Sequence, residues 1–485
     1  MSKIINSNEI AKASFATKIT TKMLDRAVCE RARRSRDPRF DGQFFIAVKT
    51  TGIFCRPICP ARQPLEKNVD YYLTAIAASQ AGFRPCLRCR PDSAPHSYFW
   101  DGTQSTVKQA LRLIQQGILQ EQSIEYLADQ LEVSSRYLRT IFTRDIGVSP
   151  KQYAIYQQCL FAKQLLHESS LSVTQVAFAS GFNSIRRFNE ALQERLSLSP
   201  TDIRKQQKKS DSVIELKLHY RPPYAWDHCF NFLKLRLVDG VEWVEERTYY
   251  RTIDYQDTQG YFSVTNDHSQ NCLIVKVCLE KVCNLLPLVQ SIRQLFDVDA
   301  SINEIDNQLN GLFGETLEYL PGMRVPGVYG VFEAGVRAVL GQQVTVVQAK
   351  KMVERIVLEL GENITIANGE KRKIFPKPGD VVSHDLSFLH MPEARKNSLR
   401  ALAKHILTSA RPNDIEAWLD LKGIGPWTVN YVKLRSSKDP DVWLAGDAGI
   451  KNALKYSNVD WQRARPWRSY LTLQLWNQLS LNKSN

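Results

Sequence analysis

The chain has 485 residues, too many for one hydrophobic core, and this length predicts about three or four domains. Lysine and arginine number 64 against 50 aspartates and glutamates, a net charge of +14 that favours a polyanionic partner such as nucleic acid. The sequence has no apolar run of about 18 residues and no leading signal segment, which argues against a membrane protein and predicts a cytoplasmic, nucleoid-associated one.

The amino-terminal region predicts a small mixed α/β arrangement. Residues 1–11 are polar, and we expect no regular structure there. Residues 22–36 have the spacing of a helix, whose arginines fit either a DNA contact or a solvated face. Residues 44–50 alternate weakly as a strand, and residues 75–81 predict a short helix that ends at Gly82.

Two close cysteine pairs lie within this region, in FCRPIC and RPCLRC. The four cysteines are Cys55, Cys59, Cys86 and Cys89. In a reducing compartment they do not indicate disulfides, whereas thiolates three and four residues apart converge well on one tetrahedral Zn²⁺. Arginines such as Arg56 and Arg62 surround the sulfurs and would hold a phosphate backbone against the metal. On spacing alone, a purely structural zinc ribbon near nucleic acid is the alternative.

The segment FFIAVKTTGIFCRPICPAR followed by AGFRPCLRC resembles the zinc-binding domain of the Ada family of adaptive-response proteins, across about residues 12–92. The resemblance implies that Cys55 is both a zinc ligand and the acceptor of a methyl group from a methylphosphotriester in DNA. The chemistry is consistent, because zinc keeps the sulfur deprotonated and a thiolate attacks a methyl carbon. Methylation removes one negative charge facing DNA, so we expect an irreversible transfer that strengthens DNA binding.

Beyond a linker expected at residues 91–105, the chain predicts helices with a repeated pattern over residues 106–205. Ser134 is the expected N-cap of one helix, and Gly147 is its stop signal. About 49 residues later the pattern returns, with Asn183 as the expected cap. The segment, with its repeat GVSPKQY and LSLSPTDI, resembles the AraC-type DNA-binding domain, in which two helix-turn-helix units enter successive major grooves.

The candidate DNA contacts of this domain lie on the second helix of each unit. Four arginines are candidates for groove and phosphate contacts: Arg136, Arg139, Arg186 and Arg187. Ser134 and Asn183 are also candidates, and a role as caps alone is their alternative. Glu132 occupies a turn position where glycine is common. A helical bundle that merely links two enzymes is the alternative for the whole segment, since this geometry also serves packing.

After a polar, basic linker at residues 205–212, residues 213–300 alternate short β-prone runs with helices near 223–237 and 285–296. This pattern predicts an α+β domain with an antiparallel sheet. Together with the residues beyond 300, the segment resembles the amino-terminal domain of AlkA-type 3-methyladenine DNA glycosylases, particularly at YRPPYAWDHCFNFL. The resemblance implies that Phe232 lines a base pocket; an ordinary core aromatic is the alternative on spacing alone.

From about residue 301 the chain again predicts helices, and the sequence LKGIGPWTVNYVKLR carries a tight turn. Gly423 and Gly425 lack a Cβ, so backbone amides there can approach a phosphate, and Pro426 suits the first position of a helix whose dipole favours the anion. With DVWLAGDAGIK beyond it, the region resembles the helix-hairpin-helix glycosylase superfamily. Thr428 is a further candidate DNA contact, and a monovalent cation is a candidate ligand of the hairpin.

The superfamily resemblance places the catalytic aspartate at Asp447. A carboxylate near C1′ stabilises the oxocarbenium-like sugar and orients or deprotonates the attacking water. The target base must be flipped out first, and the charge of an alkylated purine suits aromatic faces. The resemblance implies a pocket formed by Phe232, Trp427, Tyr431 and Trp476, and it places Gln343 where a residue is wedged into the vacated duplex space. A solvated carboxylate at a helix start is the alternative for Asp447.

Several residues and motifs that this sequence lacks narrow the predicted activity. Trp427 stands where strand-cleaving relatives carry a Schiff-base lysine, so we expect no lyase activity. No cysteine follows Cys283, so we expect no iron–sulfur cluster. Gly446, Ala448 and Asn477 depart from the AlkA pattern, as does Gln343, and these changes bear on the range of excised bases. A Pro-Cys-His-Arg type motif is also missing, so reversal at guanine O6 is not expected.

The sequence therefore predicts a multidomain α+β protein. Its expected parts are a small zinc-binding α/β domain at 12–92, an all-α double helix-turn-helix domain at 104–205, an antiparallel-sheet α+β domain at 213–300 and an all-α helix-hairpin-helix glycosylase domain at 301–480. We expect one bound Zn²⁺ and a monomeric protein. The expected partners are alkylated double-stranded DNA and promoter DNA, and RNA polymerase is a candidate partner. The implied function is DNA alkylation repair and its regulation. The alternatives are a transcription factor whose carboxy-terminal half only binds DNA, and a repair enzyme that regulates nothing.

Overall fold

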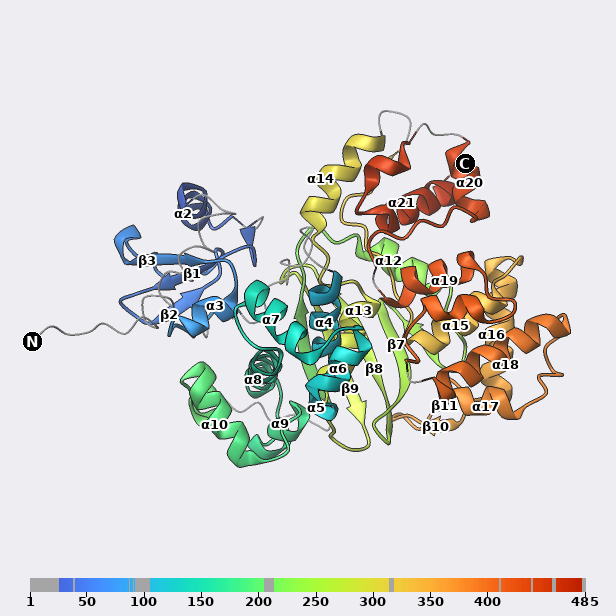
Figure 1. The fold of residues 1–485 in the computed structure, drawn as a ribbon, viewed down its shortest axis with the longest axis horizontal. Coiled ribbons are helices and arrows are strands. Elements are labelled where there is room, and N and C mark those ends of the chain that lie inside the picture. The colour runs from blue at the N-terminus through green and yellow to red at the C-terminus, as the bar shows by residue number, and fades with distance from the viewer. Residues whose placement is uncertain are drawn as a thin grey trace, which may run out of the picture. The chain divides into compact units, whose positions relative to one another are not determined.

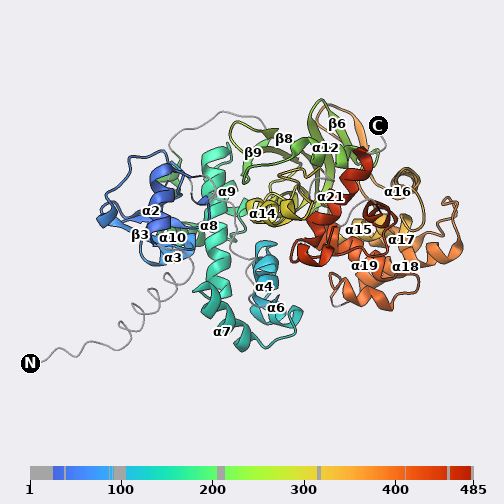
Figure 2. The same ribbon diagram turned by 90° about the horizontal axis from the view of Figure 1, so that it is seen from above.

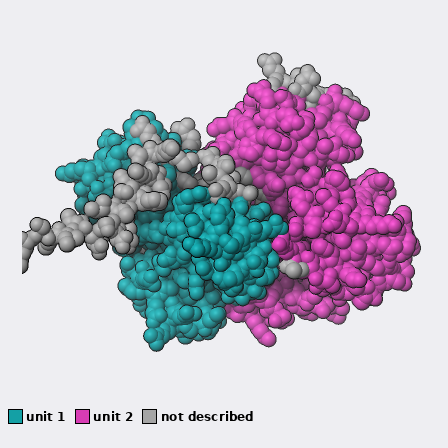
Figure 3. Space-filling view, viewed as in Figure 1, with its two compact units in different colours: residues 1–209, 284–286 teal, residues 210–283, 287–485 magenta. Residues whose placement is uncertain are grey.

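The computed structural model describes residues 26–37, 40–86, 88–89, 91, 105–204, 213–313, 318–409, 411–437, 439–455 and 459–481. The polar start and most of both predicted linkers lie outside these residues. The chain divides into two compact units, one formed by residues 1–209 and 284–286 and the other by residues 210–283 and 287–485 (Figure 3).

The first unit begins with a four-stranded sheet that has a helix against each face (Figure 1). Its elements are α2 (Arg26–Ser35), β1 (Phe45–Val48), β2 (Ile53–Cys55), η2 (Glu66–Asn68), β3 (Val69–Tyr72), α3 (Ala75–Gln80) and β4 (Arg84–Pro85), with strand order β3-β1-β2-β4. Alternate residues of β1 point to opposite faces, so Ile46 packs with Cys29 of α2 while Ala47 packs with Ala78 of α3. The predicted strand and both predicted helices are confirmed within the described residues.

The remainder of the first unit is helical. Its helices are α4 (Ser105–Gln115), α5 (Ile118–Glu121), α6 (Ile124–Gln130), α7 (Ser135–Ile146), α8 (Pro150–Glu168), α9 (Val173–Ala179), α10 (Ile185–Leu196) and α11 (Pro200–Ile203). The long helix α8 contacts α7 as well as α9 and α10, and so connects the two helix pairs (Figure 2). The pairs α6–α7 and α9–α10 confirm the predicted repeat.

Capping residues set the ends of the second helix in each pair. Ser134 accepts a hydrogen bond from the Tyr137 amide at the start of α7, and Gly147 ends that helix with φ 89°, both as predicted. The prediction that Asn183 caps α10 is wrong, because Ser184 accepts the hydrogen bond from the Arg187 amide. Both residue types are good N-caps, and sequence alone does not choose between neighbours.

Glu132 keeps the turn of the first pair in the left-handed conformation, with φ 56°. The corresponding turn of the second pair has Gly181, with φ 83°. A glycine adopts this conformation without the steric cost that a side chain brings. The first turn therefore has the same left-handed backbone at a higher conformational cost.

The second unit contains a five-stranded antiparallel sheet with order β5-β9-β8-β7-β6. Its strands are β5 (Ile214–His219), β6 (Glu242–Glu245), β7 (Thr248–Tyr255), β8 (Thr258–Asp267) and β9 (Cys272–Leu279), with helices α12 (Trp226–Lys234) and α13 (Leu286–Leu295). The predicted antiparallel α+β arrangement is confirmed. Strand β6 was not predicted. Its first residue, Glu242, is charged, and a charged residue in the sequence does not indicate a buried strand, although Glu242 is buried here.

The rest of the second unit is mainly helical. Its elements are α14 (Ile302–Phe313), α15 (Val331–Leu340), α16 (Val346–Leu360), β10 (Asn363–Thr365), β11 (Lys371–Lys373), α17 (Pro378–Ser383), α18 (Glu393–Thr408), η4 (Glu416–Asp420), α19 (Pro426–Val432), η5 (Lys433–Ser437), α20 (Ala448–Leu454), η6 (Trp461–Ala464) and α21 (Arg468–Leu481). Helix α15 packs against α16, α18 and α19 around buried Trp418. None of the helices in the described residues combines the length and hydropathy needed to span a bilayer.

A buried cluster of charges joins this sheet to α15. Arg251 is 1% exposed and forms ion pairs with Glu242 (2.9 Å) and Glu333. Arg337 contacts both glutamates at 2.7 Å. The two arginines and two glutamates balance, so the cluster is neutral and no member is buried without an opposite charge.

Glu242 should make the stability of the second unit depend on acid pH. Burial by itself raises the pKa of Glu242, but the positive charges of Arg337 and Arg251 have the larger effect and bring the pKa down to about 2. In the unfolded chain the pKa of a glutamate is about 4.3. The Glu242 carboxylate therefore stabilises the fold above that pH, and the stabilisation is lost as the pH falls towards about 2. We expect Glu242→Gln to lower the free energy of unfolding by about 3 kcal/mol at neutral pH, measured by urea denaturation.

The matched control is the exposed Glu359→Gln, which should change stability by less than about 0.5 kcal/mol. The difference between wild type and Glu242→Gln should shrink as the pH falls below about 4. A difference that stays constant down to about pH 2 would contradict the assigned role of the Glu242 charge.

Candidate functional site

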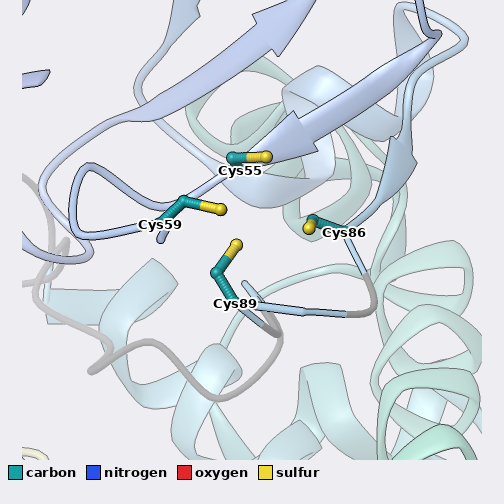
Figure 4. A group of neighbouring side chains, drawn as sticks. All are labelled: Cys55, Cys59, Cys86 and Cys89. Atoms are coloured by element: carbon teal, nitrogen blue, oxygen red, sulfur yellow. The ribbon is translucent and has the colours of Figure 1, made fainter. Parts of the chain in front are cut away.

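The four predicted cysteine ligands converge on one point (Figure 4). Their sulfur atoms all lie within 4.8 Å of one another. Cys55 ends β2, and Cys86 directly follows β4, which pairs in parallel with β2. Parallel strands lead their cysteines to the same end of the sheet, where Cys59 and Cys89 complete the set. The spacing-based prediction of a single four-sulfur site is confirmed.

Four thiols in this space cannot all ionise without a cation. Hydrogen bonding with Cys59 raises the pKa of Cys55, and hydrogen bonding with Cys55 raises the pKa of Cys89. The hydrogen bond with Cys55 lowers the pKa of Cys59 to about 7. A dication that binds all four sulfurs as thiolates removes this conflict, and four thiolates at tetrahedral spacing are the preferred donor set of structural Zn²⁺. The residues therefore fit zinc.

Backbone amides make the four sulfurs chemically unequal. Cys59 and Cys86 each accept a hydrogen bond from a backbone amide, and Cys89 accepts one from the amide of Arg56 at 3.4 Å. Within the described part of the chain, no backbone amide donates to the Cys55 sulfur. A hydrogen bond withdraws charge from a thiolate and lowers its nucleophilicity, so this arrangement is compatible with the prediction that Cys55 is the methyl acceptor.

The structure corrects the prediction that Arg56 contacts DNA. Its side chain is 7% exposed, and its guanidinium donates to Asp41 (Nε to Oδ1, 2.7 Å) and to the carbonyl of Cys89 (3.4 Å). Asp41 already neutralises this charge, so Arg56 holds the metal site together. Arg62 is exposed and stays a candidate for a phosphate contact.

The predicted contact residues of the helix-turn-helix units are all at the surface. Arg136 and Arg139 lie on α7, and Arg186 and Arg187 lie on α10; Ser134 and Asn183 precede these helices and are also exposed. Arg139 pairs with Glu125 at 3.1 Å and Arg186 pairs with Glu190 at 2.9 Å. Such exposed pairs contribute little, so a DNA phosphate can replace the carboxylate.

The sequence pattern did not point to Tyr137 and Ile185, which are 49% and 40% exposed on the same two helices. Both are suited to apolar contact with a thymine methyl group in a major groove. The sequence did offer a signal, which was the position of the residue around its helix. Tyr137 precedes the buried Leu138 and so lies outside the apolar stripe of α7.

The four predicted pocket aromatics belong to the second unit and form two stacked pairs. Trp427 and Tyr431, one turn apart on α19, stack with ring centroids 5.3 Å apart. Phe232 from α12 stacks on Trp476 from α21, with centroids 6.3 Å apart and planes 16° from parallel. The guanidinium of Arg435 links the pairs, at 4.9 Å from the Phe232 ring and 5.7 Å from the Tyr431 ring. Residues distant in sequence thus form one aromatic wall.

Asp447 lies beside this wall. Its Oδ1 accepts hydrogen bonds from the amide of Ile450 (2.9 Å) and from Nε1 of Trp476 (3.0 Å). Among the described residues, its Oδ2 has no hydrogen-bond partner. A Cβ on Gly446 would lie 3.7 Å from Trp427, which places the other aromatic pair nearby. Asp447 therefore caps the start of α20, which was the alternative to a catalytic role. It also keeps one carboxylate oxygen free for chemistry.

The two hairpin glycines differ in why glycine is needed. Gly423 has φ 87°, and a Cβ there would lie 2.1 Å from Oγ of Ser398, so a larger residue does not fit. Gly425 has an ordinary φ of −108° and open space around its Cα, which leaves room for a phosphate. Pro426 begins α19, as predicted.

The loop that carries Gln343 is tied to this hairpin. Gln342 donates hydrogen bonds to the carbonyl of Gly423 and to Oγ1 of Thr428, both at 3.0 Å. Thr428 is 1% exposed, so its backbone amide at the start of α19, and not its side chain, suits the predicted DNA contact. Gln343 is exposed with φ 57°, a strained backbone that suits the predicted wedge.

Two arginines of the pocket wall were not foreseen. Arg236 lies over the Phe232 ring, 3.7 Å from its centroid, and Arg435 donates to the hydroxyl of Tyr431 at 3.1 Å. Each follows its aromatic partner by four residues in the sequence. Tyr431 and Arg435 lie in consecutive helical segments, α19 and η5, whereas Arg236 follows the end of α12 and turns back over Phe232. The four-residue step was the signal that the sequence offered.

A four-cysteine metal site, paired helix-turn-helices and an aromatic wall that follows a glycine hairpin define a modular DNA-binding protein. Three family models match separate parts of the chain. They are the metal binding domain of Ada at residues 28–92, a helix-turn-helix domain at residues 127–206 and the AlkA N-terminal domain at residues 215–330.

Full-length similarity extends these matches. The chain is 34% identical to the probable bifunctional transcriptional activator/DNA repair enzyme AlkA of Mycobacterium tuberculosis, over 93% of this chain and 96% of the relative. DNA-3-methyladenine glycosylase 2 of Escherichia coli is 31% identical over 53% of this chain and 95% of its own length. The bifunctional transcriptional activator/DNA repair enzyme Ada of Escherichia coli is 36% identical, over 35% of this chain and 46% of its own length. The chain belongs to the family of bifunctional transcriptional activator and DNA repair enzymes of the AlkA type.

Removal of one sulfur should release the metal. We expect about one Zn²⁺ per chain in the wild type, measured by elemental mass spectrometry, and none in Cys86→Ser, because a tetrahedral structural site with three sulfurs binds far more weakly. Cys278→Ser is the matched control, since this half-buried thiol lies on β9 of the second unit and is not one of the four clustered cysteines. Full zinc retention by Cys86→Ser would contradict the four-sulfur assignment.

Proposed function

We propose that the chain repairs alkylated DNA and regulates that repair. Cys55 accepts a methyl group from a methylphosphotriester, and the second unit hydrolyses the N-glycosidic bond of alkylated bases of the 3-methyladenine type with Asp447. The family membership supports both activities. The observation that carries the hydrolase assignment is the free Oδ2 of Asp447 beside stacked aromatics.

In the methyl transfer, zinc bound by the quartet would keep the Cys55 sulfur deprotonated at neutral pH. A sulfur electron pair forms the bond to the methyl carbon, and the electrons of the breaking C–O bond return to the phosphate oxygen. The triester becomes an ordinary diester, and Cys55 becomes a thioether. The site loses one negative charge, so its repulsion of DNA falls and binding strengthens.

In base excision, the aromatic wall receives the flipped base and the hairpin holds the backbone. The bond from C1′ to the base nitrogen breaks as positive charge develops on the sugar. Asp447 stabilises this charge with its free oxygen and takes a proton from the attacking water. Because its other oxygen is held by Trp476 and by α20, the carboxylate needs little reorientation during the reaction.

The proposal extends to domain boundaries, partners and location. We place domains at 12–92, 104–205, 213–300 and 301–480, although the AlkA N-terminal match runs past the third boundary to residue 330. Promoter DNA is the proposed target of the helix-turn-helix units, with RNA polymerase as a partner, a monomeric state and action at the nucleoid in the cytoplasm. A monovalent cation at the hairpin is part of the same proposal.

Replacement of Cys55 should abolish the methyl transfer. After incubation with DNA that contains methylphosphotriesters, the wild type should gain the mass of one methyl group on Cys55, and Cys55→Ser should gain none in peptide mass spectrometry. Methylated wild type should bind promoter DNA about tenfold more tightly at low salt, because one negative charge is lost. Methylation of Cys55→Ser at another cysteine of the quartet would contradict the assignment of the acceptor.

Replacement of Asp447 separates the enzyme from a protein that only binds DNA. We expect Asp447→Asn to lower the rate of methylpurine release about 10²- to 10³-fold, because charge stabilisation of the sugar is lost. Release is measured by chromatography of bases freed from methylated duplex DNA. Asp460→Asn, an N-cap at the surface, is the matched control and should retain full activity. An unchanged rate in Asp447→Asn would contradict the catalytic assignment of Asp447, and a wild type that releases no methylpurine would favour the DNA-binding alternative.

A further inference from the structure

Positive charge accumulates beside the base pocket. Arg236 and Arg435 lie near the neutral cluster in which Arg251 and Arg337 pair with two glutamates. Within the described residues, neither Arg236 nor Arg435 forms an ion pair with a carboxylate. Arg236, Arg337, Arg435 and Glu242 line a cavity about the size of one water molecule, and Glu242 already pairs with Arg251 and Arg337. Four arginines against two glutamates leave this region with a net positive charge.

Arg236 has hydrogen-bonding capacity left over. It is half-buried, and its guanidinium stacks 3.7 Å from the Phe232 ring centroid while Nη1 donates to the Phe232 carbonyl at 3.2 Å. In the part of the chain that the structure describes, Nε and Nη2 have no partner. Burial lowers the pKa of Arg236 to about 10, so the side chain stays charged at neutral pH.

Arg435 is held rigidly behind the same ring. It is 2% exposed and donates to the carbonyls of Pro326 (2.7 Å) and Gly327 (3.0 Å) as well as to Tyr431. Burial raises the pKa of Tyr431, yet Arg435 and Arg236 bring it below its ordinary value. The positive potential at this wall is therefore strong enough to act on a buried neighbour.

Damaged bases fall into two charge classes that this potential treats differently. An N3- or N7-alkylated purine is a cation; it takes the electron pair of the glycosidic bond and leaves neutral. An uncharged base, such as the deaminated purine hypoxanthine, takes the same electron pair and leaves as an anion. Positive charge beside the base opposes binding of the first class and stabilises departure of the second.

We propose that Arg236 and Arg435 act electrostatically on the departing base and promote the excision of uncharged damaged bases. The inference rests on the proposed hydrolysis at Asp447. The C1′–N bond breaks, its electron pair goes to the base nitrogen, water oxygen bonds to C1′ and its proton passes to Asp447; the base anion then takes a proton from solvent. In this proposal the carboxylate stabilises the developing sugar cation, and the two arginines at the Phe232 ring stabilise the developing base anion.

The test compares two substrates in one variant. Single-turnover rates are measured on duplexes that contain hypoxanthine, which is neutral, or N7-methylguanine, which is cationic. We expect Arg236→Met to lower the hypoxanthine rate at least about tenfold and to leave the N7-methylguanine rate unchanged or higher. Arg236→Lys keeps a charge and should recover part of the hypoxanthine rate. Arg355→Met, on the exposed surface of α16, is the control with both rates unchanged.

Other outcomes overturn the inference. Equal losses on both substrates would mean that Arg236 only packs against Phe232, and unchanged rates would mean that the wall has no electrostatic role. If Arg236→Met does not fold, as judged by its melting temperature, Arg236→Gln gives the same comparison without the charge. A wild type that releases N7-methylguanine but no hypoxanthine also overturns the inference, whereas release of neither base overturns the proposed hydrolase function itself.

Discussion

Buried or crowded charge that a protein does not neutralise is costly, and both sites of this chain are organised around such charge. At the sulfur quartet, four thiols need a dication before they can all ionise. At the aromatic wall of the proposed base pocket, Arg236 and Arg435 form no ion pair with a carboxylate among the described residues. The cluster around Arg251 offers the contrast, because its charges balance and it serves only to join the sheet to α15. Charge balance thus separates structural clusters from those that need a ligand.

Signals confined to a few neighbouring residues were the most predictable from sequence. The spacing of the cysteines determined the quartet, because two pairs on adjacent parallel strands have few other ways to meet. Ser134 and Pro426 marked helix starts through local hydrogen bonding and ring geometry. Where two neighbours were equally suitable, as with Asn183 and Ser184, the local signal could not choose. The backbone around Glu132 kept its turn although glycine is the easier residue there.

Properties that depend on a distant partner were not predictable from local pattern. Arg56 lies between Cys55 and Cys59 in sequence, yet its charge is cancelled by Asp41, which a different loop supplies. Thr428 lies in the hairpin motif, yet Gln342 occupies its hydroxyl. The pocket joins Phe232 of the sheet region to Trp476 near the end of the chain, and only the family resemblance predicted that contact. Arg236 and Arg435 had a local signal, the four-residue step from an aromatic residue, but this step does not show which surface the pair faces.

Asp447 is a helix cap that also carries the proposed reactive oxygen. An aspartate that caps a helix is usually satisfied by the backbone, and this is why capping was a reasonable alternative to catalysis. Here Oδ1 meets both the Ile450 amide and the Trp476 indole, so the carboxylate cannot rotate without breaking two hydrogen bonds. Trp476 in turn stacks on Phe232, whose position is set by α12. The direction of Oδ2 is therefore set by packing between the sheet region and the helical region of the second unit. A substitution on either side of that contact would shift the position of this oxygen.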